Sequence, residues 1–471
     1  MTEPGLTRQA AEFAGGVKYE DIPEEALRIA RRCIIDGLGV MLAGSEQPVI
    51  DIVARYAKLN GGNGHSRVVG DASLRLPAHM AAFWNGLAGH AMDWDDTQLA
   101  EGPGRPYGLL THPTVPPLSA ALVISDMVGG VNGKDFLTAF VAGFEVECKI
   151  AEAINPDHYN FGFHTSGTIG TFGSAVTAAK LLGFDASGIA RAIGGAASMA
   201  AGIRANFGTM GKPMHVGRSS ENGVTSAILV REGFTFNEES LDGKWGFLAV
   251  AGRGGEPELV MGRFGNPFSI AEPGVSIKPY PSGVLTHPSM DAVKFLMEEN
   301  ALSPDDVESV SLFAANNILH PIRFRIAKSE LEGKFCMAFL LSAIILNGKA
   351  GKAEFTDEFV LSEPVQAMQQ RVETVFDPEI DAMGHDRIRS RVEVITKDGR
   401  KIERWADENY RGGPHNPLSD DELEGKFRDC AQGLIDDNSI QSLFDMVWKL
   451  DFQEDVTGIY DLLDWRSNRT E

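Results

Sequence analysis

Apolar positions recur at helical spacing through most of the first half of the chain. After Pro23, which favours a helix start, apolar residues between 22 and 43 follow a period of 3.6: Ala26, Ile29, Ala30, Cys33, Ile34 and Leu38. Further helices are predicted over 47–59 and 80–87, with 61–71 as a loop. From 118 to 235 the helical segments are rich in Ala, Gly and Ser. Small residues let helix axes approach closely, so this half predicts a tight helical bundle.

The pattern changes near residue 270. Segments 274–280, 307–314 and 390–405 are predicted to be strands, and Asp398-Gly399 within the last is a strong hairpin signal. Helices over 288–299 and 334–347 separate these strands. The fold class predicted is therefore mainly α with a smaller α+β domain. Its parts are an all-α helical domain over 1–270, an α/β lid over 271–405 and C-terminal helices over 406–471 that return to the helical domain.

Charge and composition narrow the classes of partner. The net charge of −22 argues against nucleic acid and anionic membranes, but it allows an anionic substrate bound by a local basic cluster. The four cysteines are far apart and form no CxxC pair, which fits a reducing compartment. The sequence shows neither a signal-peptide pattern nor a run of about 18 uncharged apolar residues. We therefore expect a cytoplasmic protein.

An unusually polar stretch, residues 90–117, separates two small apolar helical runs. On a continued helix, His90, Asp93 and Thr97 would share one face, and Asp95 would point away. One interpretation is a solvent-exposed helix end; a second is a metal site of one His and three Asp, although nothing downstream completes a known ligand spacing. A third interpretation is a functional site on a rigid scaffold, because buried polar groups need partners.

Other polar residues of catalytic type stand near predicted element boundaries. His164 precedes a Gly-rich helix start, Lys212 and His215 lie in a segment just before and into another helix, and Lys278 and Tyr280 lie near the start of the α/β domain. Histidine exchanges protons near neutral pH, and lysine binds carboxylates. With no Gly-x-Ser-x-Gly elbow, P-loop or GxGxxG after a strand, the set favours proton abstraction beside an activated carbon. No cofactor and no metal are expected.

At these residues the chain resembles the MmgE/PrpD family. The matching segments are GHAMDWDDT, THPTVPPLSAAL, FGFHTSGTIGTFGSAVTAAKLLG, KPMHVGRSSENG, SIKPYPSGVLTHPSMDA, TKDGR and NPLSDDELEGKF. They follow the family's order along nearly the whole chain. The resemblance implies a large helical domain with a smaller lid similar to chorismate mutase, a homodimer, and an active site between the two domains.

The resemblance also implies site residues. The catalytic set would be His112, His164, Lys212 and Lys278, with the histidines as acid and base. The substrate-binding set would include Asp93 and Thr97, and we add Arg105, His215 and Tyr280 from their positions. Three departures from the family pattern bear on the reaction. Phe339 replaces a frequent tyrosine, Gly283 stands where decarboxylase-like members carry a histidine, and the spacer 98–110 is longer than usual.

The first functional hypothesis is a cofactor-independent, dehydratase-type lyase acting on a small hydroxy di- or tricarboxylate. Alternatives are an epimerase of a small (imino)dicarboxylate and a decarboxylase. A non-catalytic helical binding protein belongs to a different class, and solvent deuterium exchange into candidate acids would separate it from an enzyme.

Overall fold

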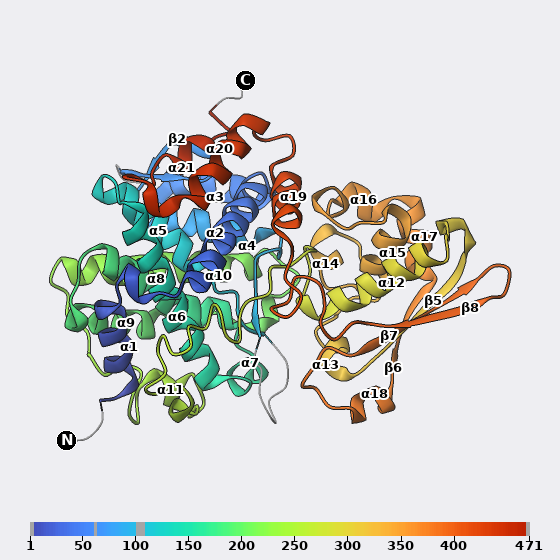
Figure 1. The fold of residues 1–471 in the computed structure, drawn as a ribbon, viewed down its shortest axis with the longest axis horizontal. Coiled ribbons are helices and arrows are strands. Elements are labelled where there is room, and N and C mark those ends of the chain that lie inside the picture. Colours follow the sequence, from blue (N-terminus) through green and yellow to red (C-terminus); the bar gives the residue numbers. More distant parts are fainter. Residues whose placement is uncertain (1–3, 61–63, 100–108, 468–471) are drawn as a thin grey trace. The chain divides into compact units, whose positions relative to one another are not determined.

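The protein is described from a computed structural model that covers residues 4–60, 64–99 and 109–467 (Figure 1). The described residues divide into two compact units, and each is considered by itself. Unit 1 comprises the residues up to 99, then 109–275 and 421–467, whereas unit 2 comprises 276–420. The sequence had placed the divisions at 271 and 406. The C-terminal residues from 421 onward thus belong to the same unit as the N-terminal helices.

Unit 1 is a helical bundle built around two long buried helices. Its helices are α1 Leu6–Gly16, α2 Glu24–Ser45, α3 Pro48–Asn60, α4 Ala78–Ala91, α5 Val115–Val128, α6 Gly133–Ile154, α7 Asp157–Phe161, α8 Thr165–Leu181, α9 Ala186–Met199, α10 Gly211–Arg231, α11 Phe247–Val250, α19 Asp420–Ala431, α20 Asp437–Trp448 and α21 Ile459–Leu462. Helix α8 packs against α5, α6, α9 and α10, and α10 also packs against α4. Since most of α8 is buried on every side, it is a core helix.

Small residues set the distance between these helices, as the sequence predicted. A Cβ added at Gly86 of α4 would lie 2.3 Å from the hydroxyl of Ser220 on α10. A Cβ at Gly223 of α10 would lie 2.4 Å from the Cβ of Ser174 on α8. Both distances are well inside van der Waals contact, so only glycine permits these approaches.

Unit 1 also contains two short sheets that the all-α prediction left out. Strands β1 Ser66–Val68 and β2 Asp71–Leu76 form an antiparallel pair inside the segment predicted to be a loop. Strands β3 Gln98–Leu99 and β4 Leu109–Thr111 form another. Short strands flanked by glycines carry little alternation, which is why the pattern missed them. Among the described residues, no single helix is long and apolar enough to cross a membrane, and α2 with α3 meets that test only as a pair bent by 79°.

Unit 2 is a four-stranded sheet with helices. Its strands are β5 Val307–Ala314, β6 Val372–Phe376, β7 Ser390–Thr396 and β8 Lys401–Trp405, in the order β6-β5-β7-β8. Only β5 and β6 are parallel. Its helices are α12 His287–Glu299, α13 Asn316–Leu319, α14 Glu330–Gly333, α15 Met337–Asn347, α16 Asp357–Leu361, α17 Glu363–Gln370 and α18 Pro378–Ala382. Helices α12 and α15 pack together and against the sheet, which buries alternate residues of β5 and β7.

Two strand predictions in this unit need correction. Residues 274–280 form no strand: proline has no backbone N–H to donate to a ladder, and Pro279 lies in this segment with Pro281 directly after it. Strand β6 was not predicted, because its alternate positions are mostly exposed. The hairpin at Asp398-Gly399 is confirmed, with Gly399 at φ +84° between β7 and β8. The fold class, mainly α with a smaller α+β part, is also confirmed.

Candidate active site

The polar stretch after α4 folds inward instead of continuing the helix. Helix α4 ends at Ala91, and Asp93 adopts a left-handed backbone with φ 53°, which is unusual for a residue other than glycine. The single helical face expected for His90, Asp93 and Thr97 is therefore wrong. The three residues are nonetheless buried, and so is Asp95, which had been expected to point away. A solvent-exposed helix end is excluded.

A chain of contacts joins this stretch to Lys212, the second residue of α10. The Nδ1 atom of His90 lies 2.8 Å from each carboxylate oxygen of Asp95. Because an ionised carboxylate only accepts, Nδ1 carries the proton and Nε2 is the acceptor. Lys212 Nζ then donates to His90 Nε2 at 2.7 Å, and it lies 3.0 Å from Asp93 Oδ2. We call Asp95, His90, Lys212 and Asp93 the lysine relay.

His112 lies beside the relay, in the turn that leads into α5. Its Nδ1 donates to the backbone oxygen of Asp96 at 2.7 Å and is 3.3 Å from the hydroxyl of Thr97. The imidazole rings of His90 and His112 meet edge to face, with centroids 4.7 Å apart. With its proton fixed on Nδ1, a neutral His112 presents Nε2 as its basic atom.

His164 occupies the N-cap position of α8, and His215 lies in the second turn of α10. One imidazole donates to the other, Nδ1 to Nδ1, at 3.1 Å. The Nε2 atom of His164 is buried and has no hydrogen-bond partner among the described residues. The ring centroid of His164 is 5.5 Å from that of His90, and Phe207 packs against it edge-on. An unpartnered nitrogen in a buried cluster is the atom most available to a bound ligand.

Burial keeps several of these imidazoles neutral. It lowers the pKa of His90, with Asp95 opposing the shift and the Lys212 charge reinforcing it. Burial, followed by the Lys212 charge, holds the pKa of His164 well below 6.5. Burial also lowers the pKa of His215 to about 4. At neutral pH these three side chains are therefore neutral, and the unpartnered Nε2 of His164 can accept a proton, while Lys212 supplies the positive charge.

Two buried carboxyl groups lie behind His112. Thr114 donates to both oxygens of Asp96, through its backbone N at 3.2 Å and its hydroxyl at 2.6 Å, yet burial still raises the pKa of Asp96 to about 8. Thr111 donates to Glu147 at 3.3 Å, and burial raises the pKa of that carboxyl well above its usual range. With raised pKa values, the Asp96 and Glu147 carboxyl groups are neutral, so they add no negative charge near the lysine relay.

The geometry also allows a metal ion to be considered. The ligand atoms of His90, Asp93, Asp95 and His112 lie within 4.8 Å of one another. Imidazole and carboxylate suit several divalent ions. Two of the four residues, however, already contact the Lys212 ammonium, which takes the place of a cation among them. The residues present therefore fit an internal ammonium better than a metal ion.

The remaining predicted site residues belong to unit 2 or lie outside the described residues. Lys278 and Tyr280 are buried in unit 2, and the Tyr280 hydroxyl donates to Asp291 at 2.5 Å. Arg105 lies outside the described residues. Phe339 is fully buried and meets Phe355 edge to face, so a hydroxyl there would face an apolar surface.

Unit 1 therefore gathers the six predicted residues Asp93, Thr97, His112, His164, Lys212 and His215. The site prediction omitted His90 and Asp95, although both stand in the motif GHAMDWDDT. Their spacing suggested divergent directions, and only the backbone turn at Asp93 brings them together. One sequence signal could have identified both residues: the motif GHAMDWDDT places several acidic residues close to one histidine between apolar helical segments.

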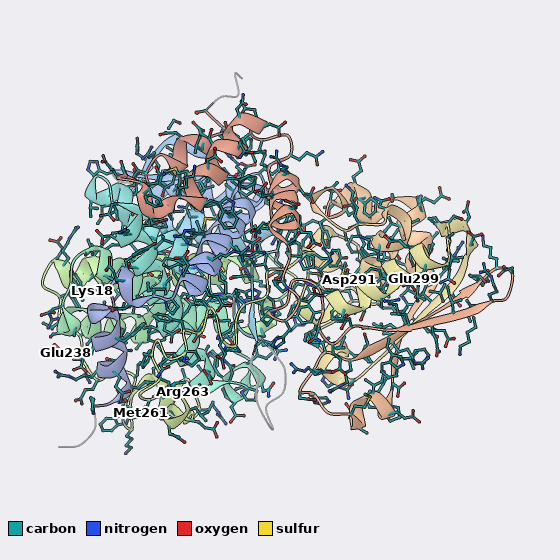
Figure 2. All side chains as sticks on the ribbon, in the orientation of Figure 1. Lys18, Glu238, Met261, Arg263, Asp291 and Glu299 are labelled. Carbon is teal, nitrogen blue, oxygen red and sulfur yellow. The ribbon has the colours of Figure 1, made fainter. Side chains whose placement is uncertain are left out.

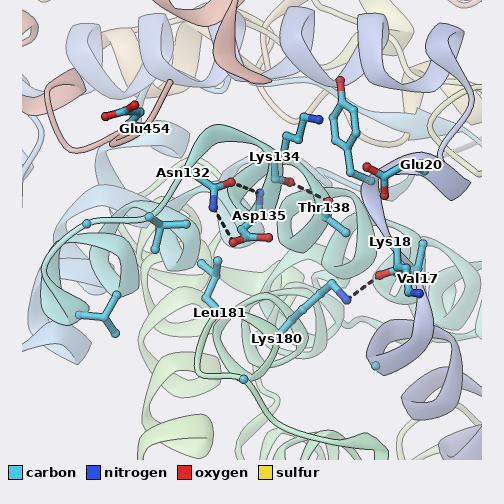
Figure 3. Close-up of a pocket in the computed structure, with 16 residues that line it drawn as sticks. Val17, Lys18, Glu20, Asn132, Lys134, Asp135, Thr138, Lys180, Leu181 and Glu454 are labelled. Atoms are coloured by element: carbon cyan, nitrogen blue, oxygen red, sulfur yellow. Dashed lines mark hydrogen bonds between the residues drawn. The ribbon is translucent and has the colours of Figure 1, made fainter. Parts of the chain in front are cut away.

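A separate pocket of unit 1 lies among α1, α6 and α8 (Figure 3), with a volume of about 870 Å³. It shares no residue with the histidine and lysine cluster. Two of its charged groups are engaged locally: Lys180 donates to the carbonyls of Ala14 and Val17, and Asp135 accepts from Asn132. These contacts complete helix ends, so they account for the charges of Lys180 and Asp135 without a ligand.

Comparison with known proteins agrees with the sequence resemblance. The family model of the MmgE/PrpD N-terminal domain matches residues 8–260, and that of the C-terminal domain matches 280–450. The cis-aconitate decarboxylases of Homo sapiens and Mus musculus are each 28% identical to this chain. The alignments cover 98% of this chain and 95% and 94% of those proteins. The cis-aconitate decarboxylase of Aspergillus terreus is 25% identical, over 98% of this chain and 96% of that protein. The chain is thus an enzyme of the MmgE/PrpD type, and it belongs to the MmgE/PrpD family.

Proposed function

We propose that this enzyme is a lyase that removes water from a small hydroxy tricarboxylate. The observation that carries the proposal is the buried cluster itself, in which neutral imidazoles surround one lysine ammonium. Its relatives, which are named for action on cis-aconitate, support a tricarboxylate as the substrate class. A multiply charged anion also fits a positive group held inside a chain whose net charge is −22.

The reaction proceeds by proton transfer at carbon. A neutral histidine, for which His164 with its open Nε2 is the leading candidate, removes the proton beside a substrate carboxylate. The Lys212 ammonium stabilises the negative charge that develops on that carboxylate. The C–O bond then breaks, and His112, which has been protonated from solvent, gives its proton to the departing hydroxyl, which leaves as water. His164 then returns the abstracted proton to solvent. Asp93 and Thr97 orient these groups, and the family resemblance assigns carboxylate binding to Lys278.

Decarboxylation is the second candidate, favoured by the names of the relatives. It would break a C–C bond, release CO₂ and then require an acid to protonate the carbon. Both reactions need an acid, but only dehydration also needs a base at carbon, which a resting cluster of neutral imidazoles supplies. Gly283, where decarboxylase-like members carry a histidine, also lacks a side chain that could act as that acid. A Cβ built there meets no atom within 4 Å, so the position can accept a larger residue.

A direct test incubates the protein with cis-aconitate and with hydroxy tricarboxylates and follows the products by NMR. We expect addition and loss of water without CO₂ release, and we expect Gly283→His to increase any CO₂ release. CO₂ release as the main reaction of the unaltered protein would replace dehydration with decarboxylation. If the protein catalyses neither dehydration nor decarboxylation and exchanges no deuterium into any acid, the result would favour a binding protein.

Three accompanying properties belong to the same proposal. Activity is expected without an added cofactor, because Lys212 already supplies the cationic charge; loss on chelation with recovery on adding one divalent ion would contradict this. The family resemblance implies a homodimer, which analytical ultracentrifugation tests. The composition implies a cytoplasmic location, which cell fractionation tests.

A further inference from the structure

We propose that His90, oriented by Asp95, is a positioning residue that holds the Lys212 ammonium in the active site. Nothing in the family resemblance assigned a role to His90. The kinetic test of this inference rests on the proposed function, because it measures turnover. The contacts of His90 with Asp95 and Lys212 do not depend on which substrate is bound.

Lys212 stands where a positive charge is poorly supported. It is the second residue of α10, and the N-terminus of a helix carries the positive end of the helix dipole. The side chain is also buried, with 6% of its surface exposed. A buried ammonium at this end of a helix requires nearby acceptors. Asp93 supplies one at 3.0 Å and His90 Nε2 supplies another at 2.7 Å.

His90 can accept this hydrogen bond only while it is neutral and protonated on Nδ1. Asp95 selects that tautomer, because both of its oxygens lie 2.8 Å from Nδ1. The groups facing His90 are Asp95, Asp93, Lys212 and the rings of His112 and His164. With Nδ1 on Asp95 and Nε2 on Lys212, neither nitrogen remains for a substrate. His90 therefore acts through Lys212, in contrast to His164.

The kinetic test is a double-mutant cycle of His90 and Lys212. His90→Asn keeps a donor for Asp95 but cannot reach Lys212, whereas His90→Gln can place its amide oxygen near the position of Nε2. We expect His90→Asn to lower kcat by about 10-fold or more, the size expected for losing a hydrogen bond to a buried charge. His90→Gln should recover much of that loss. In a Lys212→Ala background, His90→Asn should change kcat by less than about twofold.

His158 provides a matched control. It is an equally buried histidine of unit 1 whose Nδ1 donates to the Ala251 carbonyl and whose Nε2 lies 2.8 Å from the Thr168 hydroxyl. Its loss should change kcat by the same factor with and without Lys212. If His90→Asn also acts equally in both backgrounds, or if Gln restores nothing that Asn loses, His90 has no positioning role.

A spectroscopic measurement separates this inference from the proposed reaction. In protein with ¹⁵N-labelled histidine, His90 should be neutral and protonated on Nδ1, and Lys212→Met should move its Nε2 resonance and raise its pKa. His90→Gln identifies the signal by removing it. An Nε2-protonated His90, or one unaffected by Lys212→Met, would overturn the inference even if no substrate is found. The expected shifts without turnover would support the relay and reject the proposed reaction.

Discussion

Two polar networks of this chain, one in each unit, differ in how completely their hydrogen-bonding atoms are paired. Asp291 lies on α12 of unit 2 (Figure 2). The Tyr280 hydroxyl donates to Asp291 at 2.5 Å and accepts from Arg411 at 3.0 Å. Arg411 also lies 3.5 Å from Asp291, so each member contacts the other two. In unit 1, by contrast, His164 Nε2 has no partner within the described part of the chain. A network that closes on itself is explained by stability, whereas an open buried atom needs a partner from outside.

The largest expected effect follows from the open atom. His164→Gln should lower kcat by about 100-fold or more, the range expected for losing a general acid or base. The fold should persist, since glutamine can still pair with His215. Steady-state kinetics on the true substrate, with circular dichroism as the check of folding, measures this. Near-normal turnover by a folded His164→Gln protein would remove His164 from the chemistry and leave His112 as the candidate.

Lys278 tests whether unit 2 also contributes a charge to catalysis. Lys278→Ala should lower kcat/KM by about 10-fold or more through loss of a charged hydrogen bond to substrate. Lys334 is a matched control, because it is a buried lysine of the same unit paired with Glu330 at 2.7 Å. Lys334→Ala should lower Tm with little effect on kcat/KM. If both variants lose activity in proportion to Tm, Lys278 is structural.

Tyr280→Phe tests whether the network of Tyr280, Asp291 and Arg411 stabilises unit 2. Removing the hydroxyl takes a donor from buried Asp291, so we expect a loss of about 1–3 kcal/mol in unfolding free energy. We expect KM to change by less than about threefold. Calorimetry and kinetics on the same preparation decide between two roles. A raised KM with an unchanged Tm would instead support the substrate-binding role predicted from the sequence.

Buried titrating groups give opposite pH dependences of stability. Asp96 has a pKa of about 8 in the folded protein against 3.8 ordinarily, so its contribution to stability is present at low pH and lost as pH rises to about 8. His158 has a folded pKa of about 4 against 6.5, so its contribution is present above 6.5 and lost as pH falls to about 4.

Asp96→Asn and His158→Gln replace each titrating group by a neutral one. Each variant should lose that group's contribution to the pH dependence of the unfolding free energy, which is at most about 1.4 kcal/mol per pH unit. The Tm of Asp96→Asn minus the Tm of the unaltered protein should increase as pH rises. The same difference for His158→Gln should increase as pH falls. Tm measured from pH 4 to 8 tests both signs. Parallel curves for a variant and the unaltered protein would mean that the group does not change protonation on unfolding.

The smallest effect is expected from Arg105, which lies outside the described residues. The spacer 98–110 is rich in glycine and proline, and the sequence predicts a substrate-selecting loop. Arg105→Ala should change the ratio of kcat/KM between two carboxylate substrates by several-fold, while Tm stays constant. An unchanged ratio across the substrate panel would make the spacer structural only.

Several features followed directly from the sequence. The helical bundle, the strand at β5 and the hairpin at Asp398-Gly399 rest on local periodicity and turn chemistry, which are properties of neighbouring residues. The family motifs singled out His112, His164 and Lys212, which the structure brings into one cluster. These residues could be identified because each stands in a segment whose pattern is recognisable without knowing its contacts.

Only the tertiary structure decided how the cluster works. His90 and Lys212 are separated by 122 positions, so no local pattern could show that their side chains meet. The left-handed backbone at Asp93 turned Asp95 inward, against the direction that helical spacing gave it. Burial, which depends on the packing of α4, α8 and α10 together, made the imidazoles neutral and Asp96 a weak acid. Proton affinity is set by desolvation and neighbouring charge, and both arise only when distant segments come together.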